Sequence, residues 1–236
     1  MNWDTTHFKK RVAIINKNSV LNIFEMQQID DWCKKNKIDC LYYLKDYALN
    51  NDFEMENGFI GLATRIELKK CLNNNKINDF NENKDIQLEN IKPESVHKIS
   101  PEILLRFNKT RFYRDNNFNK SLVTDMYRIW VKNHINANNA EVIGAYTDNQ
   151  IVGFITYELP SKNIPKIGLF SVKSNVENLG VGSQLLNKCI MDLMQKKKDY
   201  LSVVTQKSNL KALKFYLKND FKIKSSYNWF HKWYLN

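Results

Sequence analysis

A glycine-containing turn between a predicted strand and a predicted helix constrains this chain more than any other feature. The strand covers residues 166–172, and Gly180 and Gly182 stand directly before an amphipathic run. Glycine has no Cβ, so the amides of such a turn can approach a ligand closely. The first N–H groups of a helix have no partner within it and carry partial positive charge. The turn therefore predicts an anion site, although a glycine pair of this kind can also simply close a corner.

The residues after the turn predict a helix, a strand and a second helix. Apolar residues recur at spacings of three and four along the first helix: Leu185, Leu186, Cys189, Ile190, Leu193 and Met194. Residues 200–205 have the β-rich composition of a buried strand. The second helix carries Asn209, Ala212 and Tyr216.

This segment resembles the core of the GNAT (general N-acetyltransferase) family. The family has V-x-x-x-x-[QR]-x-x-G-x-[GA] at the turn, which Val172, Gly180 and Gly182 match, and an Asn, Ala and Tyr on the later helix. Two positions depart from the pattern. Glu177 stands where the family has Gln or Arg, which removes a donor near the turn, and Asp220 stands where a glycine usually precedes the Phe.

The resemblance implies an α/β (α+β) GNAT fold whose mixed central sheet splays apart between its fourth and fifth strands to hold acetyl-CoA. The pantetheine arm would follow the fourth strand, and the pyrophosphate would meet the amides of the turn. The residues so implied are Leu169, Phe170, Ser171, Val172, Leu179, Gly180, Val181, Gly182, Ser183 and Asn209. A backbone N–H near Phe170 would polarise the thioester carbonyl. The phenol of Tyr216 would protonate the departing sulfur, although a half-buried core tyrosine is the alternative.

Three short stretches resemble, more narrowly, bacterial acetyltransferases of the TDP-fucosamine type, which act on nucleotide-linked amino sugars. They are Arg-Phe-Tyr-Arg-Asp at 111–115, Val-Val-Thr-Gln at 203–206 and Trp-Phe-His-Lys-Trp at 229–233. The resemblance implies a dTDP- or UDP-linked 4-amino-4,6-dideoxy sugar as acceptor, in surface polysaccharide or glycan biosynthesis. The candidate acceptor-binding residues are Arg111, Tyr113, Arg114, Gln206, Trp229 and His231. Arginine can grip a phosphate through two donors, but an Arg–Asp surface pair beside two core aromatics is the alternative.

The residues do not single out a general base. Glu158 and His231 are candidates, and each is equally compatible with a structural role. A weakly basic sugar amine needs no strong base, so a water relay would suffice. Two other function classes stay open: a GNAT enzyme acting on a protein, peptide or antibiotic amine, and a non-catalytic module that binds acyl-CoA.

The 236 residues suffice for one large domain or two small ones. Residues 1–92 predict a small N-terminal α/β domain that ends in a polar linker at about 73–92. Residues 93–236 predict the acetyltransferase domain. His7, in the first domain, could face a substrate or be structural.

Three expectations concern elements of the second domain. Residues 95–99 are expected to form its first strand, and residues 110–115 a substrate loop. Residues 222–233 are expected to belong to a closing strand pair, whose exposed aromatics could join two copies in a symmetric dimer.

Composition and charge narrow the partners. The formal net charge of +11 attracts polyanions, but the lysines are scattered and form no basic stripe, so acetyl-CoA and a nucleotide sugar are expected rather than nucleic acid. No apolar run approaches membrane-spanning length and no secretory signal is evident, which predicts a soluble, cytoplasmic protein. No metal is expected, because metal-ligand spacing is absent from the four cysteines: Cys33, Cys40, Cys71 and Cys189.

Overall fold

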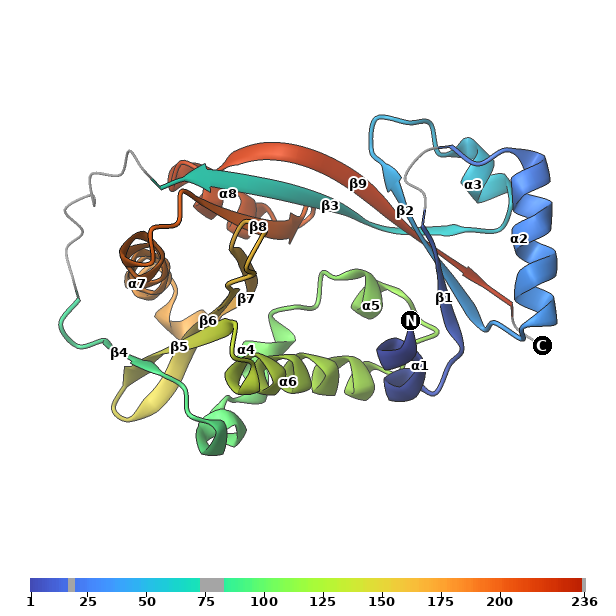
Figure 1. Ribbon diagram of the computed structural model, residues 1–236. Helices are drawn as coiled ribbons and strands as arrows, with labels where there is room; N and C mark the ends of the chain where they lie inside the picture. Colours follow the sequence, from blue (N-terminus) through green and yellow to red (C-terminus); the bar gives the residue numbers. More distant parts are fainter. Residues whose placement is uncertain (17–19, 73–82, 235–236) are drawn as a thin grey trace.

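One mixed sheet runs through the computed structural model, which describes residues 1–16, 20–72 and 83–234 (Figure 1). Within the described residues the strand order is β1-β2-β9-β3-β8-β7-β6-β5-β4. The strands are β1 (Val12–Ile15), β2 (Cys40–Asp46), β3 (Ile60–Cys71), β4 (Gln87–Asn90), β5 (Ala140–Thr147), β6 (Gln150–Glu158), β7 (Lys166–Val172), β8 (Tyr200–Gln206) and β9 (Lys222–Trp233). β1 pairs with β2, and β7 with β8, in parallel, whereas the other described pairs are antiparallel.

Helices cover both faces of the sheet (Figure 1). The α-helices are α1 (Asn2–Phe8), α2 (Ile23–Lys35), α3 (Asp52–Glu56), α4 (Pro101–Leu105), α5 (Arg111–Arg114), α6 (Lys120–Asn136), α7 (Val181–Gln195) and α8 (Leu210–Lys218); η1 (Pro93–Lys98) and η2 (Ser174–Val176) are 3₁₀ turns. One apolar core joins α7 and α8 to strand residues such as Ile167, Leu201 and Val203. A second core joins α1, α4, α5 and α6 to the opposite face. A third packs α2 on the sheet near β2 and β9.

Strand β3, from the N-terminal part of the chain, pairs with two strands from the C-terminal part. It pairs with β8 from Arg65–Gln206 to Cys71–Tyr200, and on its other edge with β9. A strand from the predicted N-terminal domain therefore lies between two strands of the predicted acetyltransferase domain. The division at residue 92 stays a prediction, but the two parts share one sheet.

The sheet opens between β7 and β8. These parallel strands are paired only at Lys166–Ser202 and Ile167–Val203. Further along, β7 pairs on its other edge with β6, with a register shift between Ile155 and Tyr157. The shift places Gly168 and Leu169 opposite the single residue Thr156, which is a β-bulge and bends the strand. The splayed pair of strands implied by the resemblance is thus present.

Several sequence predictions are confirmed. The strand at 166–172, the helix after the glycine turn, the strand beginning at Tyr200 and the final strand at 222–233 lie where they were expected.

Three predictions are wrong. Of the expected strand at 95–99, residues 95–98 belong to η1 and Ile99 follows it, because Pro93 at its first position fixes φ in a helical range; the strand at this edge of the sheet is instead β4. The segment expected as a loop at 110–115 contains the one-turn helix α5 (Arg111–Arg114), whose Phe112 is buried in the core. β9 closes the fold with β3 rather than with a second C-terminal strand. From Tyr227 to Trp233, where its aromatic residues lie, it also pairs with β2, so this part offers no free edge to a second copy.

The predicted linker at about 73–92 is described only in part. Residues 73–82 lie outside the described residues, and Gln87–Asn90 form β4.

Candidate functional site

The glycine turn presents free amides at the start of α7. Gly180 is the N-cap residue with a φ of 85°, a left-handed conformation that suits glycine. Among the described hydrogen bonds, none uses the N–H of Val181, Gly182 or Ser183, as expected for the first turn of a helix. A Cβ added to Gly182 would lie no closer than 3.7 Å to the Phe170 and Phe215 rings, so alanine would also fit there.

Strand β7 leads from the split of the sheet to this turn. At its bulge the N–H of Leu169 donates to Thr156 Oγ1 at 2.8 Å. Ser171 Oγ donates to the Ile103 carbonyl at 2.7 Å, so this hydroxyl is already used inside the protein. The Phe170 ring packs edge-on against Phe215 with a centroid distance of 5.6 Å.

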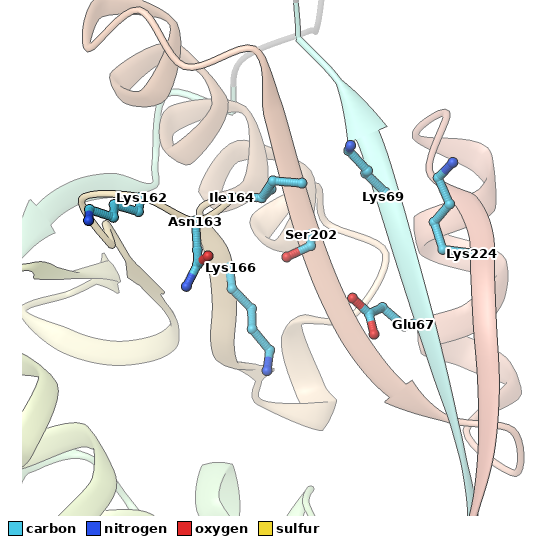
Figure 2. A pocket seen from close by; sticks show the side chains of 8 residues that line it. All are labelled: Glu67, Lys69, Lys162, Asn163, Ile164, Lys166, Ser202 and Lys224. Carbon is cyan, nitrogen blue, oxygen red and sulfur yellow. The ribbon is translucent and has the colours of Figure 1, made fainter. Parts of the chain in front are cut away.

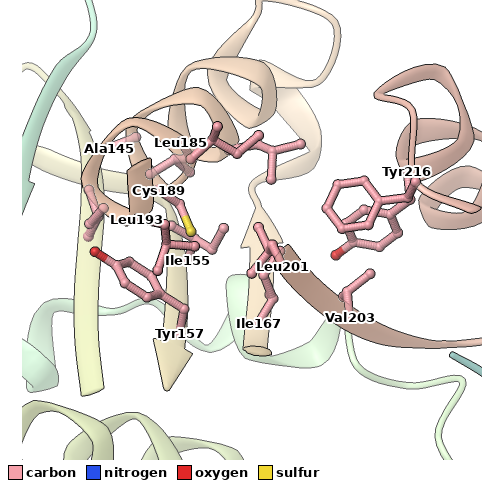
Figure 3. Close-up of a cluster of buried hydrophobic side chains, with 14 of the residues drawn as sticks. Ala145, Ile155, Tyr157, Ile167, Leu185, Cys189, Leu193, Leu201, Val203 and Tyr216 are labelled. Carbon is pink, nitrogen blue, oxygen red and sulfur yellow. The ribbon is translucent and has the colours of Figure 1, made fainter. Parts of the chain in front are cut away.

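Tyr216 lies on α8 and faces the strands beside the split. Its ring is buried against Phe170, Phe215 and Phe221. Figure 3 shows the side chain facing Leu201 and Val203. No hydrogen bond of its hydroxyl is found among the described residues. Burial raises the pKa of Tyr216, so the phenol holds its proton at neutral pH and can act as a donor.

Asn209 and Glu177 have protein partners of their own. Asn209 caps α8, since its Oδ1 accepts from the N–H of Ala212 at 3.4 Å. The carboxylate of Glu177 accepts from Arg106 and from Lys211 Nζ, the latter at 2.8 Å. Hydrogen bonding to Lys211 lowers the pKa of Glu177. The residue that departs from the family pattern therefore neutralises two cations close to the turn.

Three of the predicted acceptor residues meet in one buried cluster. The guanidinium of Arg111 lies 4.1 Å from the ring centroid of Trp229 and 4.4 Å from that of Tyr42. It also donates to His231 Nε2 at 3.3 Å, while His231 Nδ1 donates to Asp115 Oδ2 at 2.6 Å. Arg111 is thus engaged inside the protein, where it fastens α5 to β9.

The protonation state of His231 follows from its two partners. Arginine can only donate, so Nε2 must accept and the imidazole is neutral. Burial lowers the pKa of His231 to about 4, in agreement with this geometry. Burial alone would raise the pKa of Asp115, but hydrogen bonds from His231, Asn117 and Trp233 bring it below its ordinary value.

The other predicted acceptor residues lie apart from this cluster. The Tyr113 hydroxyl is 2.6 Å from Thr124 Oγ1, and its ring is parallel to that of Tyr127. Arg114 is exposed on α5. Gln206 lies on β8 opposite Arg65 of β3, and its Oε1 has no hydrogen-bond partner. The predicted acceptor set therefore does not form one site.

Of the two base candidates, Glu158 is the accessible one. His231 is fully buried, whereas 44% of the Glu158 side chain is exposed. Glu158 Oε1 lies 3.1 Å from Nε2 of His134, a buried residue on α6 that was not predicted from the sequence. Burial lowers the pKa of His134, and its Nδ1 has no hydrogen-bond partner. No motif marks His134; its proximity to Gly168 is visible only in the fold.

His7, the remaining candidate, has contacts within the protein. Its Nε2 lies 2.8 Å from the Leu122 carbonyl and its ring stacks on Trp3 at 4.7 Å.

The comparison with protein families covers the segment that builds this site. Residues 107–221 match the acetyltransferase (GNAT) family. The matched segment holds the turn, the split strands and Tyr216, and the match supports the family predicted from the sequence.

Known proteins resemble larger parts of the chain. The spore coat polysaccharide biosynthesis protein SpsD of Bacillus subtilis is 24% identical over 127 residues, which cover 54% of this chain and 44% of that protein. The chain thus spans less than half the length of the curated relatives it matches. A tandem GNAT protein from the clavulanic acid biosynthesis pathway has a TM-score of 0.65 at 10% identity, covering 89% of this chain and 69% of its own.

A second similar structure contains the coenzyme. The PaiA N-acetyltransferase from Thermoplasma acidophilum, solved in complex with coenzyme A, has a TM-score of 0.52 at 18% identity and covers 63% of this chain and 99% of its own. These likenesses confirm the predicted mixed α/β GNAT fold.

Three further observations concern the described residues alone. No helix among them combines the length and apolar character needed to cross a membrane. No group of three or more His, Cys, Asp or Glu side chains within residues 1–16, 20–72 and 83–234 is arranged to hold a metal ion. The four cysteines are free thiols, and Cys71 is the exposed one.

Proposed function

We propose that the protein transfers the acetyl group of acetyl-CoA to the amino group of a nucleotide-linked 4-amino-4,6-dideoxy sugar, by direct transfer in a ternary complex. The observation that carries acetyl transfer is the split between β7 and β8, which leads to three free amides and is faced by Tyr216. An added strand-like ligand can hydrogen-bond to an unpaired strand edge. The free amides and the helix N-terminus suit a diphosphate.

Acetyl-CoA supplies the thioester whose carbonyl carbon the amine attacks, so that a C–N bond forms and a C–S bond breaks. The backbone of residues 169–172 would hold the pantetheine arm, with an N–H near Phe170 as oxyanion donor. The Tyr216 hydroxyl would give its proton to the departing sulfur. The proton lost by the amine would go to Glu158 or to water.

The identity of the acceptor amine is proposed on separate grounds. The three short stretches similar to TDP-fucosamine-type enzymes support an amino-sugar nucleotide. The similar protein SpsD is named as a spore coat polysaccharide biosynthesis protein, which also supports a role in polysaccharide biosynthesis. Acceptors of other classes, such as a protein, a peptide or a polyamine, are the alternative, as is a module that binds acyl-CoA without catalysis.

A thiol-release assay tests the function. With acetyl-CoA present, we expect coenzyme A release to depend on a dTDP- or UDP-linked 4-amino-4,6-dideoxy sugar and to be absent with a polyamine or a peptide N-terminus. Release with the peptide or polyamine alone would refute the amino-sugar acceptor. No release with any amine, despite binding of acetyl-CoA, would favour the non-catalytic module.

Replacing Glu177 by Gln should tighten coenzyme A binding about threefold or more at low salt. The change frees Arg106 and Lys211 and removes a negative charge close to the proposed diphosphate site. Titration calorimetry at low and high salt measures the effect, which should shrink as salt screens it. Glu141→Gln is the matched control, because Glu141 pairs with Lys196 at the far end of α7. Unchanged or weaker binding by the Glu177 variant would contradict this role.

A further inference from the structure

A cavity of ≈ 370 Å³ lies at the start of β7 (Figure 2). Its walls come from the loop before β7 and from β7, β8, β3 and β9, which are brought together only by the order of the sheet. Six of its lining residues carry charge or a hydroxyl group: Lys69, Lys162, Lys166, Lys224, Glu67 and Ser202. We call this the lysine pocket. None of these residues belongs to the coenzyme site described above.

The lysine pocket has a strong excess of positive charge. Four lysines face one carboxylate, which leaves a formal charge of +4 − 1 = +3. The carboxylate of Glu67 also lies 3.6 Å from Arg65 Nη2, so its negative charge is shared between Arg65 and the lysines. Within the described residues, no ion pair is formed by Lys162, Lys166 or Lys224. Several unpaired ammonium groups around one cavity are suited to a ligand with more than one negative charge.

Lys166 is the least exposed of the three unpaired lysines. Burial lowers its pKa, and the nearby guanidinium of Arg65 acts in the same direction, whereas the carboxylates of Glu158 and Glu67 raise it. Neither carboxylate forms an ion pair with Lys166 among the described residues. An anion in the lysine pocket would add a counter-charge to this half-buried ammonium group.

The lysine pocket adjoins the closed end of the split in the sheet. Lys166 and Ser202 form one of the two residue pairs that still join β7 to β8, and the strands part directly after them. Side chains alternate between the faces of a strand, so these two point away from the face on which Ile167 and Val203 meet α7 and α8. The other end of β7 is six residues or about 20 Å away, and the glycine turn lies beyond that end. A thioester that followed β7 from the turn would end near the lysine pocket.

We propose that the lysine pocket binds the diphosphate group of the amine acceptor, and this rests on the acetyl transfer proposed above. A nucleoside diphosphate-linked amine fits the charge, because the diphosphate meets several ammonium groups. A polyamine or a lysine-rich peptide does not fit, because like charges repel. The volume lies at the lower end of the range for small-molecule sites, so the lysine pocket holds part of the acceptor. Arg111, the phosphate ligand suggested by the sequence, is engaged in its buried cluster.

Titration calorimetry with inorganic pyrophosphate tests the lysine pocket directly. Saturating coenzyme A is included, so that the start of α7 is filled and cannot bind the probe. We expect one pyrophosphate site, with a Kd that rises at least about tenfold in K166Q/K224Q. K224Q alone, which changes an exposed side chain, should raise the Kd about threefold without affecting folding. The matched control is K34Q/K35Q, two exposed lysines at the end of α2, for which Kd should change less than twofold.

The source of the diphosphate is tested by competition. dTDP should displace pyrophosphate from the wild-type protein, and an amino sugar without a nucleotide should not. No pyrophosphate site in the presence of coenzyme A, or equal weakening by the pocket and control variants, would overturn the proposal. These readouts need no turnover. A failure of acetyl transfer with every acceptor would therefore refute the proposed function while leaving diphosphate binding by the lysine pocket supported.

Discussion

Tyr216→Phe should lower kcat for acetyl transfer at least about 100-fold, because it removes the proton donor proposed for the departing sulfur. General acid catalysis by a positioned side chain typically contributes 10²- to 10⁴-fold. Acetyl-CoA affinity should change little, since the ring and its contacts with Phe215 and Phe221 are retained. Steady-state kinetics with the amino-sugar nucleotide, together with calorimetry for acetyl-CoA, separate the two effects.

Stability should also be unaffected, because the Tyr216 hydroxyl has no hydrogen-bond partner among the described residues to lose. Tyr200→Phe is the matched control: Tyr200 is on β8 and 41% exposed, and kcat should stay near the wild-type value. A Tyr216→Phe enzyme with full turnover would remove Tyr216 from the mechanism. The sulfur would then leave as a thiolate or take its proton from water.

Asp115→Ala should destabilise the fold by about 3 kcal/mol or more, the largest stability effect we expect from one side chain. The Asp115 carboxylate accepts from His231 Nδ1 at 2.6 Å and from Trp233 Nε1 at 2.9 Å. Its side chain is only 1% exposed, so water cannot replace it. Each buried donor left without an acceptor costs about 1–3 kcal/mol.

Thermal unfolding measures this effect. For a chain of this length, a loss of 3 kcal/mol lowers Tm by roughly 6–12 °C. Asp125→Ala is the control, since the Asp125 side chain is 47% exposed and forms an ion pair with Arg128 at 3.8 Å; its cost should stay below about 1 kcal/mol. Equal Tm values for the two variants would show that the Asp115 cluster does not hold α5 on the sheet.

The local elements of the coenzyme site could be predicted from the sequence because their signals are local. Gly180 marks the start of α7 through its conformation, and the period of apolar residues marks the buried face of that helix. Tyr216 was found through a motif on a single helix. Such features depend on neighbours within a few residues along the chain.

The acceptor side could not be predicted in the same way. Arginine is a common phosphate ligand, yet the guanidinium of Arg111 contacts three aromatic rings and His231 once α5 packs on β9. His134 approaches Gly168 only because α6 crosses the sheet there.

The sequence by itself determined the strand, turn and helix of the proposed coenzyme site, and with them the resemblance to GNAT acetyltransferases. Only the tertiary structure decided that β3 lies between β8 and β9, and therefore that Lys69 shares a cavity with Lys166 and Lys224. The physical reason is that strand order depends on how whole faces of the sheet are buried. That burial is a sum over residues far apart in the chain, and no short stretch of sequence records it.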